Sequence, residues 1–310
     1  MRLLRVLAVS LLSATIASAM PINSSARSCV PGDLLQLISV DYRSLKDSPT
    51  AIALKQQLMP DNIKQFEAAL KGIGLDPEKD IDSLTFASFR TGKQGLKTVG
   101  VAAGPFNRAA VLKKMKLQKY VPKKYNNSDI YPMDGGFVMS FLDESTLLFG
   151  DSTSIRVALD TRDGQVMGLD TNGNMADMMA DVDSASVWSI LDQQGTQNAL
   201  HSALGDASKI ADYETIKKRL VGSRYSMNFN NGVNFDMTVV TSDSTTAATV
   251  SSLLKGYMLY KKMSATPAEK IAVDNTSIDS DGSNVGLHFK ASDQQFQSLM
   301  HSELFAAVTH

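Results

Sequence analysis

The sequence places a serine where several hydrolases carry their nucleophile. The stretch TLLFGDSTSIRVAL, residues 146–159, reads as a strand, a turn at Gly150-Asp151-Ser152 and then a helix. A serine at the start of a helix can attack an ester, but its hydroxyl is a poor nucleophile until a neighbouring base takes its proton. Ser152 is therefore the candidate catalytic residue, and it needs a base.

The turn resembles the first block of GDSL-type esterases, in which a downstream Asp-x-x-His element supplies that base. The resemblance implies ester hydrolysis at Ser152. No histidine of the chain has an aspartate three positions before it; the four are His201, His288, His301 and His310. The family's block also lies near the mature N-terminus, and its glycine–asparagine oxyanion block has no match here. The chain departs from the family at every later motif.

The same turn also has a structural interpretation as a helix cap. The order strand, short junction, helix recurs in residues 99–115, 237–254 and 286–300, with junctions at Gly104-Pro105, Asp243-Ser244-Thr245 and Ser292-Asp293. A polar side chain at such a junction accepts hydrogen bonds from the unpaired N–H groups of the first turn, and a carboxylate there favours the helix dipole. We therefore predict that Ser152 caps a helix and is not a nucleophile.

Metal and cofactor sites are not indicated. The oxygen-rich segments 169–174 and 274–284 lack the first ligand and the final glutamate of an EF-hand loop. The histidines are not spaced for zinc, Cys29 is the single cysteine, and the glycines form no phosphate loop. We expect no metal and no cofactor.

The first nineteen residues predict export. Two arginines precede the apolar run VLAVSLLSATIA, and ASA at 17–19 suits a signal peptidase. We reject lipidation at Cys29, which lies well beyond the apolar core. No later stretch is long enough to span a bilayer, so we expect a soluble, secreted or periplasmic mature chain. A net charge of −1 over 310 residues argues against a nucleic-acid partner.

Two clusters allow a functional and a structural interpretation. The segment KKMKLQKYVPKK, Lys113 to Lys124, holds six lysines. It is either a docking surface for anionic lipid, glycan or nucleic acid, or a solvated helix end that continues into a loop, and the second is favoured. The second cluster either fills the core or lines an adaptable surface, with core filling favoured; it comprises Met175, Met178, Met179, Met258 and Met263.

The periodicity predicts an α+β protein built from two similar units, each an antiparallel sheet with helices on one face. The units are residues 30–167 and 184–308, joined by a linker at 168–183 that contains a short Met-bearing helix. Strands are predicted at 33–42, 83–90, 97–104, 129–151 and 185–193, and hairpins turn at Asn231-Gly232 and Asp281-Gly282. Helices are predicted at 48–59, 61–74, 107–116, 152–161, 195–204, 212–220, 244–263 and 293–305.

The stretch 146–164, followed by a strand with Trp188, resembles predicted secreted proteins of bacteria that carry no assigned activity. This resemblance implies an envelope or extracellular setting and no mechanism. Three functional hypotheses remain. The first is an exported, non-enzymatic protein that binds an envelope or extracellular protein. The second is a carrier of an apolar ligand between sheet and helices, and the third is a serine esterase at Ser152.

Overall fold

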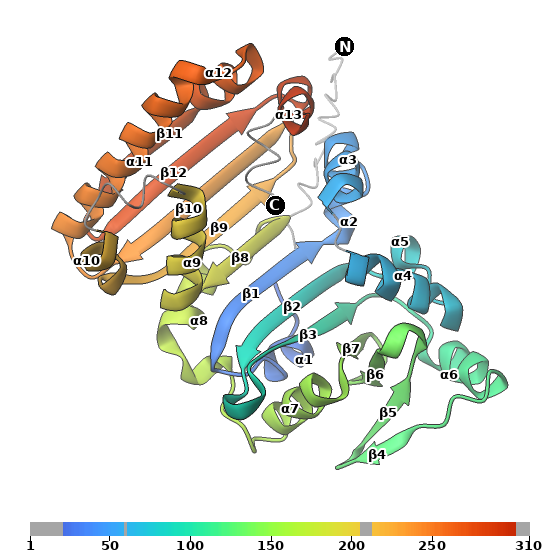
Figure 1. Ribbon diagram of the computed structural model, residues 1–310. Helices are drawn as coiled ribbons and strands as arrows, with labels where there is room; N and C mark the ends of the chain where they lie inside the picture. The colour runs from blue at the N-terminus through green and yellow to red at the C-terminus, as the bar shows by residue number, and fades with distance from the viewer. Residues whose placement is uncertain (1–20, 59–60, 205–212, 302–310) are drawn as a thin grey trace, which may run out of the picture.

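A computed structural model describes residues 21–58, 61–204 and 213–301. The predicted signal sequence and the last residues of the second predicted unit lie outside the described residues. Helices and antiparallel strands alternate along the chain, and the strands join into one twisted sheet (Figure 1). The predicted α+β class is confirmed. Among the described residues, no helix has the length and apolar character needed to cross a membrane.

The sheet has twelve strands in the order β11-β12-β10-β9-β8-β1-β2-β3-β7-β6-β5-β4. The strands of the N-terminal half are β1 (Leu34–Asp41), β2 (Ser83–Arg90), β3 (Leu96–Ala103), β4 (Lys123–Tyr125), β5 (Ser128–Pro132), β6 (Val138–Phe141) and β7 (Thr146–Gly150). Those of the C-terminal half are β8 (Val187–Leu191), β9 (Leu220–Asn228), β10 (Val233–Thr241), β11 (Thr276–Asp281) and β12 (Asn284–Ala291).

The strand order repeats between the halves of the chain. The run β1-β2-β3-β7-β6 has the same connectivity as β8-β9-β10-β12-β11. The two runs meet where β1 pairs antiparallel with β8, so that Leu37 lies opposite Ile190. The two predicted sheets are therefore halves of one continuous sheet, and the hairpin of β4 and β5 extends only the N-terminal half.

The longer helices connect these strands. They are α3 (Pro49–Leu58), α4 (Asp61–Ile73), α6 (Arg108–Leu117), α7 (Ser152–Arg162), α8 (Gly173–Ala180), α9 (Gln193–Leu204), α10 (Tyr213–Lys218), α11 (Ser244–Ser264), α12 (Pro267–Asp274) and α13 (Asp293–Met300). Three short ones are α1 (Ser24–Ser28), α2 (Tyr42–Leu45) and α5 (Pro77–Asp80), and single 3-10 turns are η1 (Gly92–Gln94), η2 (Asp134–Gly136) and η3 (Leu169–Thr171).

Helices cover both sides of the N-terminal half of the sheet. Successive strand residues point to opposite sides, and on β2 Leu84 packs in a cluster with α4 and α6, while Ala87 and Phe89 pack in a cluster with α1, α7 and α8. The prediction placed helices on one side only. The second layer forms because the alternate strand residues are also apolar and must be buried.

The C-terminal half has most of its helices on one side, while α8 covers β8 and one end of β9 on the other. The apolar side chains of β9, β10 and β12 pack in two clusters with α9 to α13. The two halves differ at the last helix of the repeat. Ile155 of α7 packs on one side of the sheet, and Phe296 of α13 packs on the other. The side of the sheet that α7 covers in the N-terminal half therefore receives no equivalent helix in the C-terminal half among the described residues.

The predicted linker is part of the core. Met175, Met178 and Met179 of α8 are buried in the same cluster as Trp188 of β8. These methionines fill the core, as favoured from the sequence, whereas Met263 of α11 is exposed.

Candidate functional site

Ser152 is the first residue of α7 and is exposed. The capping side chain is that of Asp151, whose carboxylate accepts hydrogen bonds from the amides of Thr153 and Ser154 at 2.8 and 2.9 Å. The prediction that Ser152 caps the helix is wrong by one residue. Asp151 is the residue with extended backbone just before the first turn, and only from there can a short side chain reach back to these amides.

The other three junctions are capped in the same way. Asp243 accepts from the amide of Thr246 at 2.8 Å, and Ser292 forms a capping box with Gln295 at the start of α13. The hydrogen bond from Thr246 is the main reason that the pKa of Asp243 falls to about 2. At the fourth junction Asn107 is the cap, two residues beyond Gly104-Pro105.

Among the described residues, no hydrogen bond joins Ser152 to a histidine. His201 lies in α9, His288 in β12 and His301 at the C-terminal end of α13. His310 lies outside the described residues. The structure therefore places the candidate serine at a capped helix start without assembling a proton relay around it from the described histidines.

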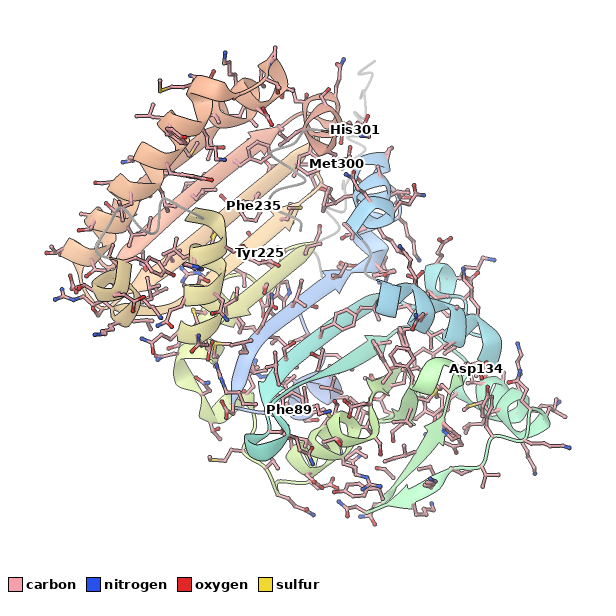
Figure 2. The ribbon with its side chains drawn as sticks, in the orientation of Figure 1. Phe89, Asp134, Tyr225, Phe235, Met300 and His301 are labelled. Atoms are coloured by element: carbon pink, nitrogen blue, oxygen red, sulfur yellow. The ribbon has the colours of Figure 1, made fainter. Side chains whose placement is uncertain are left out.

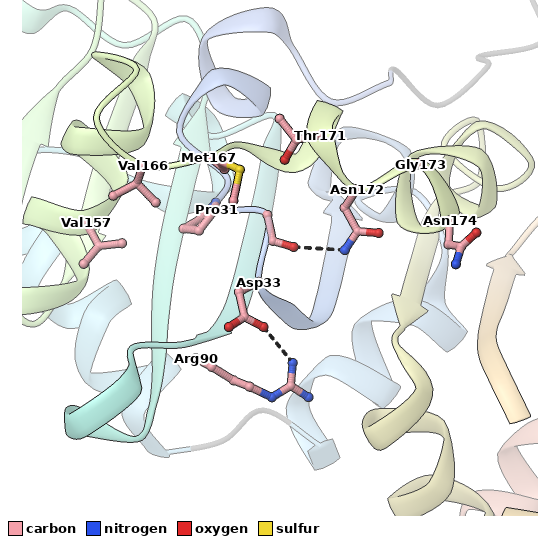
Figure 3. Close-up of a pocket in the computed structure, with 11 residues that line it drawn as sticks. Pro31, Asp33, Arg90, Val157, Val166, Met167, Thr171, Asn172, Gly173 and Asn174 are labelled. Carbon is pink, nitrogen blue, oxygen red and sulfur yellow. Dashed lines mark hydrogen bonds and ion pairs between the residues drawn. The ribbon is translucent and has the colours of Figure 1, made fainter. Parts of the chain in front are cut away.

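A surface pocket of about 650 Å³ opens beside α7 at the ends of β1 and β2 (Figure 3). Its apolar wall includes Val157, Val166 and the exposed Met167. Its polar wall includes Asp33 and Arg90, with the loop before α8 completing the rim. The volume suits a small ligand.

The polar groups of this pocket largely bind one another. Arg90 donates to Asp33 at 3.1 Å and to Asp192 at 2.7 Å, and the Asn172 amide donates to the carbonyl of Gly32 at 2.9 Å. Two carboxylates around one guanidinium leave no net positive charge to attract an anion. The charged wall is therefore paired internally, while Val157, Val166 and Met167 make the opposite wall apolar.

A second site lies on the C-terminal half of the sheet. Residues paired across antiparallel strands point to the same side, and one side of β9–β12 is polar apart from Gly286 and from Gly222 and Val240, which lie at the end next to α8. We call this side the uncovered face; its members are Arg224, Ser226, Asn234, Asp236, Thr238, Ser277, Asp279, Asp281, Asn284, Gly286, His288 and Lys290. The other side is apolar, with Tyr225 and Phe235 side by side at 5.7 Å between ring centroids (Figure 2).

His288 stands at the centre of the uncovered face between two carboxylates. Its Nδ1 lies 2.6 Å from Oδ1 of Asp236, and its Nε2 lies 3.6 Å from Oδ2 of Asp279. The three side chains are 49%, 54% and 63% exposed, respectively. Gly286 makes the convergence possible, since a Cβ there would lie 2.7 Å from Oδ1 of Asp279 and 3.0 Å from Nε2 of His288.

The uncovered face is acidic. It carries three aspartates, Asp236, Asp279 and Asp281, and one lysine, Lys290. Its arginine, Arg224, forms an ion pair at 3.0 Å with Asp181 at the end of α8. Both ring nitrogens of His288 lie near carboxylates, so the arrangement can accept hydrogen bonds and bind cationic groups but presents no activated hydroxyl. This site was not predicted from the sequence, although the polar alternation in β10 and β12 is a signal for it.

Cys29 and the two oxygen-rich segments lie in the core or in regular secondary structure. Cys29 is buried against the N-terminal half of the sheet, and burial raises the pKa of its thiol to about 11. Segment 274–284 forms β11 and its turn, and segment 169–174 forms η3 and the start of α8. Within the described ranges, no three or more histidine, cysteine, aspartate or glutamate side chains are grouped to hold a metal ion.

Comparisons with known proteins assign no activity. No protein-family model matches the chain, and no curated protein does. Among solved structures, the chain is similar to TP0453 in its crystal forms I and III, with TM-scores of 0.46 and 0.49 and 9% sequence identity in both. These matches cover 94% and 92% of this chain and 98% of TP0453.

Proposed function

We propose that this protein is an exported, non-enzymatic binding protein of the cell envelope or extracellular space. Its partner is a protein with a basic surface, which binds the uncovered face. The observation that supports this proposal is the acidic character of that face around His288, where exposed Asp236 and Asp279 converge.

Electrostatics favour a basic partner. Antiparallel sheets commonly leave one side to water, so exposure alone would not suggest a site. Here Asp236, Asp279 and Asp281 lie on neighbouring strands of that side, and lysine or arginine side chains of a partner would relieve their mutual repulsion. Such complementarity speeds encounter and selects the partner.

Site-specific crosslinking in cells that produce the protein tests the proposal. A photoreactive amino acid replaces Thr238, which is half-buried at the centre of the uncovered face. We expect a crosslinked protein adduct there and none when the same amino acid replaces the exposed Lys71 of α4. The double variant Asp236→Lys, Asp279→Lys is expected to lower the adduct yield about tenfold, because like charges then meet.

The matched control reverses two exposed charges elsewhere, Asp47→Lys and Glu78→Lys, and should leave the yield unchanged. An absence of adducts at Thr238, equal adducts at Lys71, or equal losses in both double variants would overturn the proposal.

A further inference from the structure

Two apolar side chains face water at the C-terminal end of α6 and just beyond it. Leu117 is 76% exposed and Val121 is 73% exposed. On the inner side of the same helix, Val111 and Met115 are buried against the sheet. The helix is therefore fixed to the core by one side while its end presents aliphatic groups outward. Pro122, also exposed, continues this apolar tip.

Lysines surround the tip. All six side chains of the segment are exposed, namely Lys113, Lys114, Lys116, Lys119, Lys123 and Lys124. Within the described part of the chain, Lys124 is the one lysine of this set in an ion pair, with Asp129 at 2.9 Å. The positive charge of the other five is not neutralised locally, although the chain as a whole has a net charge of −1.

The tip is held in place by hydrogen bonds. The amide of Tyr120 donates to the carbonyl of Met115 at 3.0 Å, and the amide of Lys119 donates to that of Lys116 at 3.1 Å. Lys119 adopts a left-handed conformation with φ of 63°, at a position where glycine is favoured. The Tyr120 hydroxyl donates to the carboxylate of Asp134 at 2.8 Å, and the side-chain amide of Gln118 donates to the carbonyl of Gly72 at 3.2 Å.

The chain after the tip is also ordered. The sequence favoured a solvated helix end that continues into a loop; the helix end is present, but Lys123 to Tyr125 form β4, which pairs with β5. Lys123 and Lys124 follow the tip directly in the chain, and as successive strand residues their side chains point to opposite sides of β4. The apolar tip and the lysines near it therefore lie on an ordered backbone.

We propose that this lysine-ringed tip docks the protein onto the surface of an anionic lipid bilayer. Lysines are attracted to anionic headgroups, and the Leu117 and Val121 side chains lose contact with water when they enter the boundary between headgroups and acyl chains. A nucleic acid would use the lysines only, because aliphatic side chains gain nothing from a phosphate backbone. This inference does not depend on the partner proposed for the uncovered face.

Vesicle co-sedimentation of the full mature chain tests the inference. We expect binding to vesicles of equimolar phosphatidylglycerol and phosphatidylcholine, weakened by salt, and none to vesicles of phosphatidylcholine alone. A triple variant with Lys113→Gln, Lys116→Gln and Lys123→Gln should lower the affinity for the anionic vesicles on the order of a hundredfold. Leu117→Ser with Val121→Ser should weaken it about tenfold.

The control removes three exposed lysines elsewhere, Lys46→Gln, Lys218→Gln and Lys255→Gln, and should bind like the unmodified chain. Because every substituted side chain is exposed, circular dichroism should show unchanged folding in all variants. The inference is overturned by a lack of binding to anionic vesicles, by an equal loss in the control, or by full binding of the Leu117 and Val121 variant. Single-stranded DNA binding through the same lysines, without vesicle binding, would assign the surface to nucleic acid and overturn it too.

Discussion

At the scale of single residues, Asp151 and Ser152 are neighbours with different roles. Asp151 has an extended backbone and accepts two amide hydrogen bonds, whereas Ser152 has a helical backbone and an exposed side chain. Asp151 also lies 3.2 Å from the ammonium group of Lys97 on β3. The aspartate joins the start of α7 to the sheet, and the serine does not take part.

Substitution of each residue by alanine separates these roles. Asp151→Ala should lower the free energy of unfolding by about 1 kcal/mol, the usual cost of a lost N-cap. Ser152→Ala should change it by less than about 0.5 kcal/mol, as for an ordinary surface position. Urea denaturation at neutral pH measures both, and equal effects of the two substitutions would contradict the assignment of the cap.

The effect of Asp151→Ala should also depend on pH. Partial burial raises the pKa of Asp151, but hydrogen bonds from Ser154 and Lys97 lower it more, so the pKa lies below the ordinary value of 3.8. A group with a lowered pKa in the folded state stabilises the fold above its unfolded pKa and loses this contribution as the pH falls through its folded pKa. The difference between the native chain and Asp151→Ala should therefore shrink below about pH 3.8.

At the scale of elements, the contact between β3, β7 and α4 depends on a glycine. A Cβ at Gly100 would lie 2.1 to 2.5 Å from three ring carbons of Phe149. Phe149 cannot easily move, because its ring stacks on Phe66 of α4 with centroids 3.4 Å apart. The missing side chain on β3 is what lets this aromatic stack lie flat on the sheet.

Gly100→Ala should destabilise the protein by about 1–3 kcal/mol through overpacking. The control is Gly256→Ala in α11, where a Cβ meets nothing within 4 Å. That substitution should stabilise the protein by about 0.5–1 kcal/mol, because alanine is the better helix former. Denaturation curves of the two variants should shift in opposite directions, and a shift of both in one direction would contradict the packing argument.

At the scale of the whole molecule, the two repeated halves share one core. Trp188 and Ile190 of β8 lie in the same buried cluster as Leu34 and Leu37 of β1. The helix α8, between the halves, packs into this cluster as well. The chain is therefore expected to unfold as a unit and not half by half.

This expectation can be measured with one tryptophan. Trp188 fluorescence reports on the junction of the halves, and far-ultraviolet circular dichroism reports on the whole chain. The two signals should give coincident transitions in urea, as in a cooperative two-state process. A fluorescence transition separated from the dichroism transition would show that the halves unfold independently.

Much of the fold followed from local patterns. The predicted strand at 83–90 is β2 (Ser83–Arg90), and the Asn231-Gly232 turn joins β9 to β10 with φ values of 57° and 103°. These elements are decided by alternation and by turn chemistry within a few residues. The same patterns did not anticipate β4, because the strand is three residues long and forms only by pairing with β5.

The sequence by itself determined the α+β class, the repeated order of elements and the polar caps, because these depend on neighbours along the chain. Only the tertiary structure decided that the two sheets merge at β1 and β8, and that α7 and α13 lie on opposite sides. It also brought Asp236, Asp279 and His288 together from three strands. Such contacts join residues far apart in sequence, and the burial of apolar side chains on one side of a strand decides which polar ones meet on the other.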